Sequence, residues 1–379
     1  MSTSPNQFIL SAAISGFGAH PGATGAARSL VDVAHYRRLL QAAEAGRLDF
    51  VLLDDARAIP TGRVVGRLDA LAILARLAPE VPHLGLAASS PTTYSEPFHI
   101  SRELATLDFV SGGRAAWSVT TTSTDHEAAN YGRAHALPPE QRRARAEEFV
   151  AVSRKLWDSW EDDAVITDRT RGLYLDPTKL HHINHVGPHF QVRGPQITYR
   201  PPQGHVVVIQ DDQGDPAVVP SATVAEVLIL HHETLAEAQT AYAQHQAVAA
   251  ADGHAVRILQ RILPILGATE VLARVRAAEL DAAAEGAAAP RALRLVGTAA
   301  QVADQLAAWF AAGAADGFHL LPATLPEGLE EIARNLVPEL QRRGLFRSAY
   351  AGRTLRAHLG LPRPLSQYAG APAEAFTAY

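Results

Sequence analysis

The sequence predicts an α/β fold of the TIM-barrel type, a ring of eight parallel strands with insertions. Short apolar, β-prone runs alternate with helix-like segments along the chain, which is typical of parallel α/β folds. Polar residues follow several of these runs where a buried strand would reach the surface. The chain has 379 residues, 47% of them apolar, and TIM barrels of this size occur as a single domain.

Eight apolar runs are the expected strands. They cover residues 8–14, 49–53, 83–88, 115–119, 206–210, 225–230, 256–266 and 316–322. Helical periodicity fills most of the intervals, as in the stripe of Leu104, Leu107 and Val110, which Gly112 then ends. In parallel α/β proteins the carboxyl ends of the strands carry the chemistry, so the polar residues that follow the runs are the first candidates for a site.

Composition excludes several classes of protein. The net charge of −5 without a basic stripe gives nucleic-acid binding no support. No run approaches the roughly 20 apolar residues of a membrane span, and the N-terminus lacks an export signal. The absence of cysteine excludes disulfides, thiolate nucleophiles and cysteine-ligated metals. We therefore expect a cytoplasmic protein with neither nucleic-acid nor membrane partners.

Several polar clusters have a structural and a chemical interpretation. The glycines of residues 16–25 suggest a phosphate cradle, but no Gly-Lys-Ser/Thr follows, which argues against a P-loop. Four histidines within residues 181–189 invite a metal, yet prolines and glycine there favour a loop, and no carboxylate has suitable spacing. For the pair His231-His232 local hydrogen bonding is favoured over acid–base chemistry. For Glu147-Glu148 a solvated helix face is favoured over a paired-carboxylate site.

The segment 107–132 also resembles a known signature. Leu107-Asp108, Ser111-Gly112-Gly113-Arg114, Trp117, Thr121 and Ala129-Asn130-Tyr131-Gly132 are similar to the motif of flavin-dependent monooxygenases related to bacterial luciferase. The branch is that of nitrilotriacetate and dibenzothiophene-sulfone monooxygenases. Similarity continues through 142–160, 337–347 and 354–364. The resemblance implies one TIM-barrel domain over residues 1–379, with a core of about 8–346 and a C-terminal tail, 347–379.

The resemblance also implies a function. Such an enzyme takes reduced FMN from a separate flavin reductase, forms a flavin C4a-peroxide with O₂, and oxygenates a small organic substrate. No nicotinamide-binding unit is visible in this chain, which agrees with a two-component system. The family commonly forms dimers or tetramers, and no metal is implied.

The resemblance assigns roles to individual residues. His20 would handle protons, although a loop histidine bonded to backbone is an equal alternative. Without the resemblance, Asp55 would be interpreted as a helix cap or loop charge. The residues implied to bind the cofactor are Asp55, Ser89, Ser118, Thr121, Gln210 and Gly214.

Departures from the family pattern support a second hypothesis. The family loop that cradles the FMN phosphate is replaced here by a segment containing Asp211, Asp212, Asp215 and Pro216, which lacks an N–H. Like charges about 4 Å apart cost on the order of 4 kcal/mol near a protein surface. The FMN phosphate should therefore fit poorly: it is held elsewhere, bound weakly, or no longer bound.

Other departures point the same way. Thr24 stands in place of tryptophan and Ser118 in place of asparagine. A short alanine-rich link at 277–292 stands in place of a longer insertion, which predicts an open pocket with a shortened lid. The alternative to the oxygenase is therefore a non-catalytic relative with a degenerate flavin site, acting as a binding or structural protein.

Overall fold

A closed ring of eight parallel strands forms the centre of the computed structural model, which describes residues 7–59, 66–212 and 214–369. Each strand pairs with the next around the ring, and the last returns to the first through the Gly317–Ile9 register. In order around the ring they are β1 (Ile9–Ile14), β2 (Phe50–Leu53), β3 (Gly85–Pro91), β4 (Ala115–Thr120), β9 (Val207–Asp211), β10 (Val227–Leu230), β11 (Arg257–Leu266) and β13 (Gly317–Leu320). The TIM-barrel prediction is confirmed, and all eight expected strands are present.

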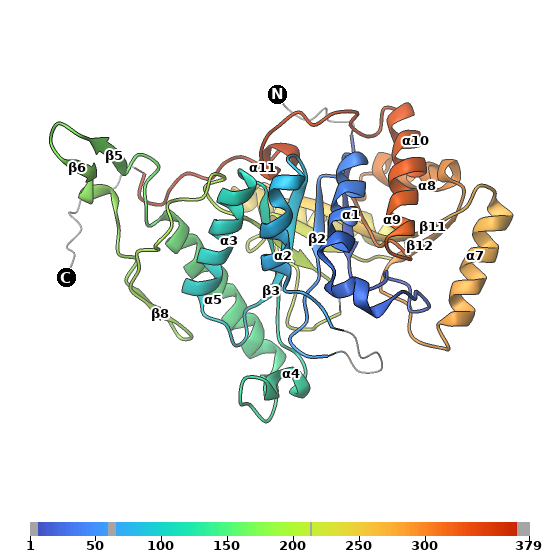
Figure 1. Cartoon of the computed structure of the whole chain (residues 1–379), viewed down its shortest axis with the longest axis horizontal. Helices are drawn as coiled ribbons and strands as arrows, with labels where there is room; N and C mark the ends of the chain where they lie inside the picture. Colours follow the sequence, from blue (N-terminus) through green and yellow to red (C-terminus); the bar gives the residue numbers. More distant parts are fainter. Residues whose placement is uncertain (1–6, 60–65, 213, 370–379) are drawn as a thin grey trace.

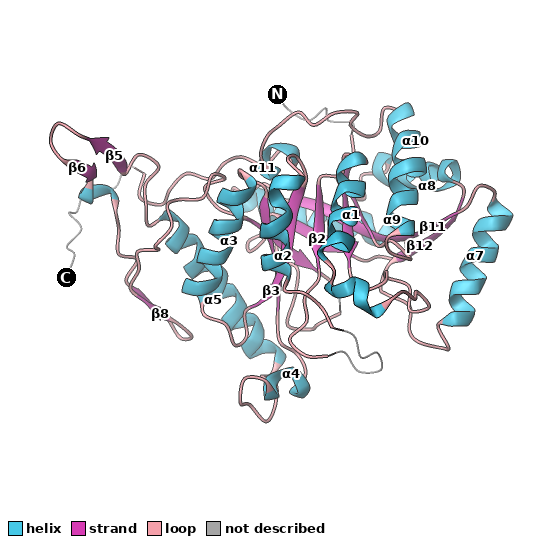
Figure 2. Ribbon diagram, viewed as in Figure 1, coloured by secondary structure: helices cyan, strands magenta, loops and turns pink. Residues whose placement is uncertain are grey.

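Helices surround this ring (Figure 2). The longer ones are α1 (Val33–Ala45), α2 (Ala70–Leu77), α3 (Pro97–Ser111), α5 (Pro139–Asp158), α6 (Leu235–Ala251), α7 (Glu270–Ala283) and α8 (Ala299–Ala311). Shorter ones are α4 (Asp125–Ala129), α9 (Glu327–Glu331), α10 (Val337–Arg342) and α11 (Leu355–His358). The described residues between β9 and β10 contain no helix, as Pro216 and Pro220 suggest.

Side chains alternate along each strand between two cores. Inward residues such as Phe50, Ala116 and Ile209 form one cluster inside the barrel. Outward residues such as Trp117 and Val208 belong to the larger cluster under the helices. Because strand side chains alternate faces, this pattern decides which polar residues at the strand ends face the barrel interior.

The C-terminal segment closes the amino-terminal end of the barrel. Leu355, Leu359 and Leu361 belong to the same interior cluster as Phe50 and Ile209. In Figure 1, α11 lies at one end of the strands and α4 at the other. Part of the expected C-terminal tail, 347–379, therefore contributes to the interior of the barrel.

The signature around Gly112 is structural. Gly112 ends α3 with φ +69°, as expected. Arg114 is buried and donates to the carbonyl oxygens of Ala78, Val81, Leu84 and Ser111 at 2.5–3.0 Å. The motif thus ties α3 and β4 to the preceding turn at the amino-terminal end of the barrel.

A second part of the motif has the same role. The buried carboxylate of Asp108 accepts from Gln203 N at 3.1 Å and from Ala115 N at 3.1 Å.

One detail of the prediction for the helix before Gly112 is wrong. Val110 is 46% exposed and lies off the buried stripe of Leu104 and Leu107.

An insertion between β4 and β9 carries α4, α5 and two hairpins. The hairpins are β5 (Val165–Asp168) with β6 (Leu173–Leu175), and β7 (His185–Val186) with β8 (Gln191–Val192). Its histidines have separate partners: His181 bonds Glu161 at 2.8 Å and His185 bonds Glu148 at 2.9 Å. Within the described ranges no group of three or more His, Cys, Asp or Glu could hold a metal ion. Glu148 anchors this loop, while Glu147 is exposed.

The connection after β11 differs from the expected link at 277–292. Only residues 267–269 join β11 to α7, and the first part of the expected link is the end of that helix. The rest leads to β12 (Leu293–Gly297), an unpredicted ninth strand that pairs with the outer half of β11 beyond the ring. No helix among the residues described is long and apolar enough to cross a membrane.

Candidate active site

A cavity of about 550 Å³ lies at the carboxyl ends of β2, β3, β4 and β9. This is the end of a TIM barrel at which active sites are found. Side chains from four strand ends and from α5 meet there. The residues that line it are Asp54, Asp55, Arg57, Pro91, Val119, Thr120, Thr121, Ser123, Glu127, Arg142, Asp211, Gly214, Asp215, Pro216 and Val218.

Asp55, Thr121 and Gly214 were predicted site residues, and all three line this cavity. The Asp55 side chain is nearly buried, accepts from Ala56 N at 2.8 Å and faces Arg57 at 3.4 Å. Burial raises the pKa of this carboxyl. Gly214 has φ +87°, a conformation that side chains rarely adopt, and it brings backbone to the cavity wall.

Ser89 and Ser118 were predicted too, and they are not among the residues that line the cavity. The strand register sets them side by side, two residues before the lining residues Pro91 and Thr120. Both follow the inward face of their strands, since Ala87 and Ala116 two residues earlier lie in the interior cluster. Both are buried, and neither hydroxyl has a hydrogen-bond partner within the described structure. A buried hydroxyl without a partner costs about 1–3 kcal/mol, so this pair is suited to a polar ligand.

Gln210 does not lie with these residues. It follows Val208 on the outward face of β9, and its side-chain oxygen accepts from Ser221 N at 2.8 Å. It is not among the residues that line the cavity. The expectation that Gln210 lines the flavin is therefore not supported, because period-two alternation turns its side chain toward the helices.

His20 also lies outside the cavity lining. Its Nδ1 accepts from Gly22 N at 3.2 Å, and its Nε2 lies 3.2 Å from the Asp281 carboxylate of α7. Since Nδ1 is an acceptor, the proton is on Nε2 and is donated to Asp281. Both nitrogens are engaged, which matches the loop-histidine alternative rather than a proton-handling role.

The three carboxylates after Gln210 each pair with an arginine. Asp211 bonds the Arg261 guanidinium inside the barrel, and Asp212 lies 3.3 Å from Arg291 Nη2. Asp215 accepts from Arg142 Nη1 at 2.8 Å and from the Thr121 hydroxyl. The expected mutual repulsion of this loop is therefore largely offset.

Sequence reasoning missed Arg142, Arg261 and His319. His319 is buried in β13, and its Nδ1 lies 2.8 Å from the Ser11 hydroxyl. Burial, with a contribution from Arg261, lowers the pKa of His319 to about 3, so the ring is neutral at pH 7. These residues come from strands and helices far apart in the chain, so no local motif joins them.

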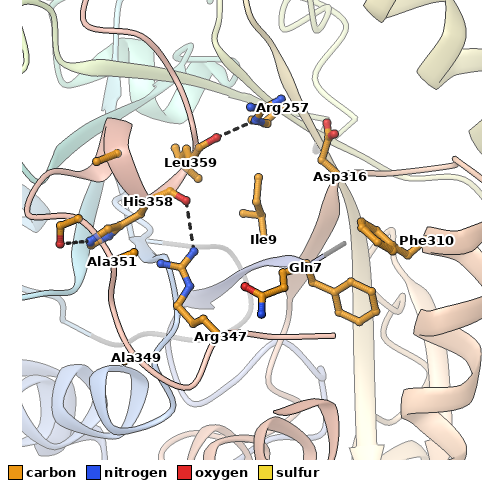
Figure 3. Close-up of a pocket in the computed structure, with 13 residues that line it drawn as sticks. Gln7, Ile9, Arg257, Phe310, Asp316, Arg347, Ala349, Ala351, His358 and Leu359 are labelled. Atoms are coloured by element: carbon orange, nitrogen blue, oxygen red, sulfur yellow. Dashed lines mark hydrogen bonds between the residues drawn. The ribbon is translucent and has the colours of Figure 1, made fainter. Parts of the chain in front are cut away.

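A second pocket, of about 450 Å³, lies at the opposite end of the barrel (Figure 3). Its arginines already serve the protein. Arg257 donates to Leu359 O at 2.7 Å, while Arg347 bonds Asp49 and donates to His358 O at 3.2 Å. Because these cations hold the C-terminal segment, we do not assign this pocket as the active site.

Comparison with known proteins identifies relatives along nearly the whole chain. The family model of luciferase-like monooxygenases matches residues 11–316. An N-acetyl-S-(2-succino)cysteine monooxygenase of Bacillus subtilis (strain 168) is 34% identical, covering 92% of this chain and 94% of the relative. Component A of nitrilotriacetate monooxygenase from Aminobacter aminovorans is 33% identical, covering 89% and 92%.

A solved structure agrees with these relatives. EDTA monooxygenase from Chelativorans sp. BNC1 has a TM-score of 0.83 at 26% identity, covering 94% of this chain and 99% of that chain. The alignment with the Bacillus relative spans 417 positions, more than the 379 residues here, so that relative carries residues that this chain lacks.

Proposed function

This chain belongs to the luciferase-like monooxygenases, and from that premise we propose that it inserts one oxygen atom of O₂ into a small organic substrate, using reduced flavin supplied by a separate reductase. Membership in the family confirms the resemblance that the motifs indicated. The observation that carries the proposal is the polar cavity at the carboxyl end of the barrel, with Ser89 and Ser118 unpartnered beside it.

The residues at this end suit the ring and the hydroxylated chain of a flavin. Ser89 and Ser118 offer two buried hydroxyls that have no partner in the described structure. His319 does not line the cavity, but its neutral ring lies in the barrel next to Arg261, the partner of the cavity residue Asp211. They do not suit a terminal phosphate, since the Arg142 guanidinium already holds Asp215. A bound reduced flavin would supply the electrons that activate O₂, and the protein supplies binding and orientation.

The chain's own residues define what this site can do. Ser89 and Ser118 can orient a polar ring edge, because both stand on rigid strands rather than on a loop. The ion pair of Asp211 and Arg261 places two charged groups inside the barrel, and Arg261 lies near the neutral ring of His319. Only residues 267–269 connect β11 to α7, so this connection holds no long lid, and we expect bound substrate to help exclude water.

The non-catalytic alternative is not favoured. Its main support was the repulsion among Asp211, Asp212 and Asp215, and each of these carboxylates has an arginine partner. The relatives compared above are named monooxygenases.

The test supplies reduced flavin from an added flavin reductase under ¹⁸O₂, with a panel of small organic compounds that begins with nitrilotriacetate and N-acetyl-S-(2-succino)cysteine. We expect ¹⁸O in a product only when protein, reduced flavin and substrate are all present. Reductase and flavin without this protein are the control and should yield hydrogen peroxide alone. Failure of the purified protein to bind any flavin, oxidised or reduced, would refute the proposal.

A further inference from the structure

Arg142 and Thr121 at the cavity wall form an anion-binding site. The anion that they bind is the carboxylate of Asp215, a residue of the same chain. Arg142 Nη1 donates to Thr121 Oγ1 at 2.7 Å and to Asp215 Oδ2 at 2.8 Å, and the Thr121 hydroxyl donates to the same carboxylate. An arginine fork and a hydroxyl are the groups that proteins use to hold phosphate oxygens. All three residues line the cavity.

Both halves of this cluster are held in place. The Arg142 side chain is only 4% exposed, and its Nε donates to Leu137 O at 3.0 Å. Asp215 accepts from Ala217 N at 3.0 Å through its other carboxylate oxygen, and Pro216 stiffens the turn between them. A ligand phosphate at this position would have to displace a fixed carboxylate and leave it unpaired beside a dianion.

Among the described residues that line the cavity, the other cation is Arg57, and it already faces a carboxylate. Of the described residues that line the cavity, five are carboxylates (Asp54, Asp55, Glu127, Asp211 and Asp215) and two carry guanidinium groups, Arg57 and Arg142. Arg57 faces Asp55 at 3.4 Å. Of the arginines near the loop, Arg261 bonds Asp211 and Arg291 lies against Asp212. Each of these arginines is thus already paired with a carboxylate, so a doubly charged ligand tail has to compete with a fixed anion for positive charge.

We propose that Asp215 is a built-in anion that fills the phosphate position between Arg142 and Thr121, so that the cavity prefers a flavin with an uncharged ribityl tail, riboflavin, over FMN. This inference rests on the proposed function, since it assumes that the cavity takes a flavin. It names the cofactor class that the reductase has to deliver: a reduced flavin without a terminal dianion.

The experiment compares dissociation constants of riboflavin and FMN by fluorescence titration, in the oxidised form and, anaerobically, by competition in the reduced form. The wild-type protein should bind riboflavin about tenfold tighter than FMN or more, since one charge-assisted contact is worth about 1.5–3 kcal/mol. Asp215→Ser frees the guanidinium of Arg142. It should tighten FMN binding by about tenfold or more and leave riboflavin within about threefold.

Two further variants keep the result interpretable. Asp215→Asn removes the charge but keeps an acceptor for Ala217 N–H, so it guards against misfolding of the turn. Asp212→Ser makes the same charge change in the same loop, but Asp212 pairs with the half-exposed Arg291 and does not line the cavity. It should leave the preference unaltered. Melting temperatures report whether each variant is folded.

The outcomes separate the two proposals. Wild-type protein that binds FMN more tightly than riboflavin, or Asp215 variants with no gain for FMN, would overturn this inference and leave the flavin enzyme intact. Equal gains in Asp212→Ser and Asp215→Ser would also overturn it, because a general charge effect would then explain the preference. If neither flavin binds any variant, this inference and the proposed function are both rejected.

Discussion

At the residue scale, the candidate site depends on which face of a strand each polar side chain takes. Ser89 and Ser90 are neighbours on β3, both buried and both without a partner for the hydroxyl in the described structure. Ser89 follows Ala87 toward the barrel interior, whereas Ser90 follows Ala88 toward the helices. Two adjacent residues of one type thus differ only in the face that they occupy, which makes them a matched pair for experiment.

Replacing Ser118 or Ser89 with Ala tests whether these hydroxyls bind the cofactor. Ser118→Ala and Ser89→Ala should weaken flavin binding by about threefold to tenfold each, because a hydrogen bond is worth about 0.5–1.5 kcal/mol. Neither should lower the stability of the free protein, since each hydroxyl is buried without a partner. Flavin titration and thermal unfolding measure the two effects.

Ser90→Ala is the control for this pair. Its hydroxyl is equally buried and unpartnered but faces the helices, so flavin affinity should stay within about twofold while stability is unchanged or slightly raised. A loss of flavin affinity in Ser90→Ala as large as in Ser118→Ala would mean that the substitutions disturb β3 and β4 in general.

The predicted site residues that reach the cavity are those whose position follows from the local sequence. Asp55, Thr121 and Gly214 line the cavity, and the position of Ser89 beside Ser118 follows from strand ends alone. Gln210 lies outside the cavity because it is one residue away from the inward-facing positions of β9, and a shift of one residue turns a side chain to the other face of the strand. The arginine partners of Asp211 and Asp215 lie 50 and 73 residues away in the chain, so local patterns could not reveal that the loop is neutralised.

At the element scale, the unit of α3 and β4 shows that a recognisable motif need not be catalytic. Arg114 joins four backbone carbonyls at the amino-terminal end of the barrel, far from the carboxyl ends that form the cavity. The motif is therefore specific to the family because it stabilises the family's fold.

The eight strands of the ring were predicted because their buried runs are short and apolar. β12 was not predicted, because it alternates between buried and more exposed residues, as an edge strand does.

Arg114→Lys should destabilise the protein by roughly 3 kcal/mol or more. A lysine has one nitrogen and cannot reach carbonyls that converge on a guanidinium from separate turns, so buried acceptors lose their donors. Urea unfolding at pH 7 measures the change. The control is Arg102→Lys, an exposed position on α3, which should stay within about 0.5 kcal/mol. Equal stability of the two variants would contradict the structural role of Arg114.

At the scale of the whole molecule, the C-terminal segment and the middle of the chain meet at the amino-terminal end of the barrel. Arg356 of α11 donates to Glu226 at 2.8 Å and to His205 O at 3.0 Å, and the other oxygen of Glu226 accepts from Val208 N at 2.8 Å. The C-terminal leucines then fill the amino-terminal end of the barrel. The sequence did not predict this closure, because a short helix with one leucine in it and two leucines after it has no feature that specifies its distant partner.

Glu226 makes this closure sensitive to acid. Burial alone would raise its pKa, but Arg356 and Arg154 outweigh burial and lower the pKa to about 2, against an ordinary value of 4.5. A carboxyl with a lowered pKa stabilises the folded state above its unfolded value, so this contribution is complete above pH 4.5 and is lost as the pH falls toward 2. Its size is about 3 kcal/mol, at about 1.4 kcal/mol for each pH unit.

Glu226→Gln removes the charge and should therefore be less stable than the wild type by about 3 kcal/mol at pH 7, with the difference shrinking steadily below pH 4.5. Asp49 and Asp108 act in the opposite sense, because burial raises the pKa of each to about 6 and their contribution is lost as pH rises from about 4 to 6. The wild type and Glu226→Gln share those two groups, so their effect cancels in the difference between the two free energies of unfolding.

Urea unfolding at several pH values between 3 and 7 measures this difference, with the exposed Glu147→Gln as the control. A difference that stays constant from pH 7 to 3 would show that Glu226 does not hold the C-terminal closure through its charge.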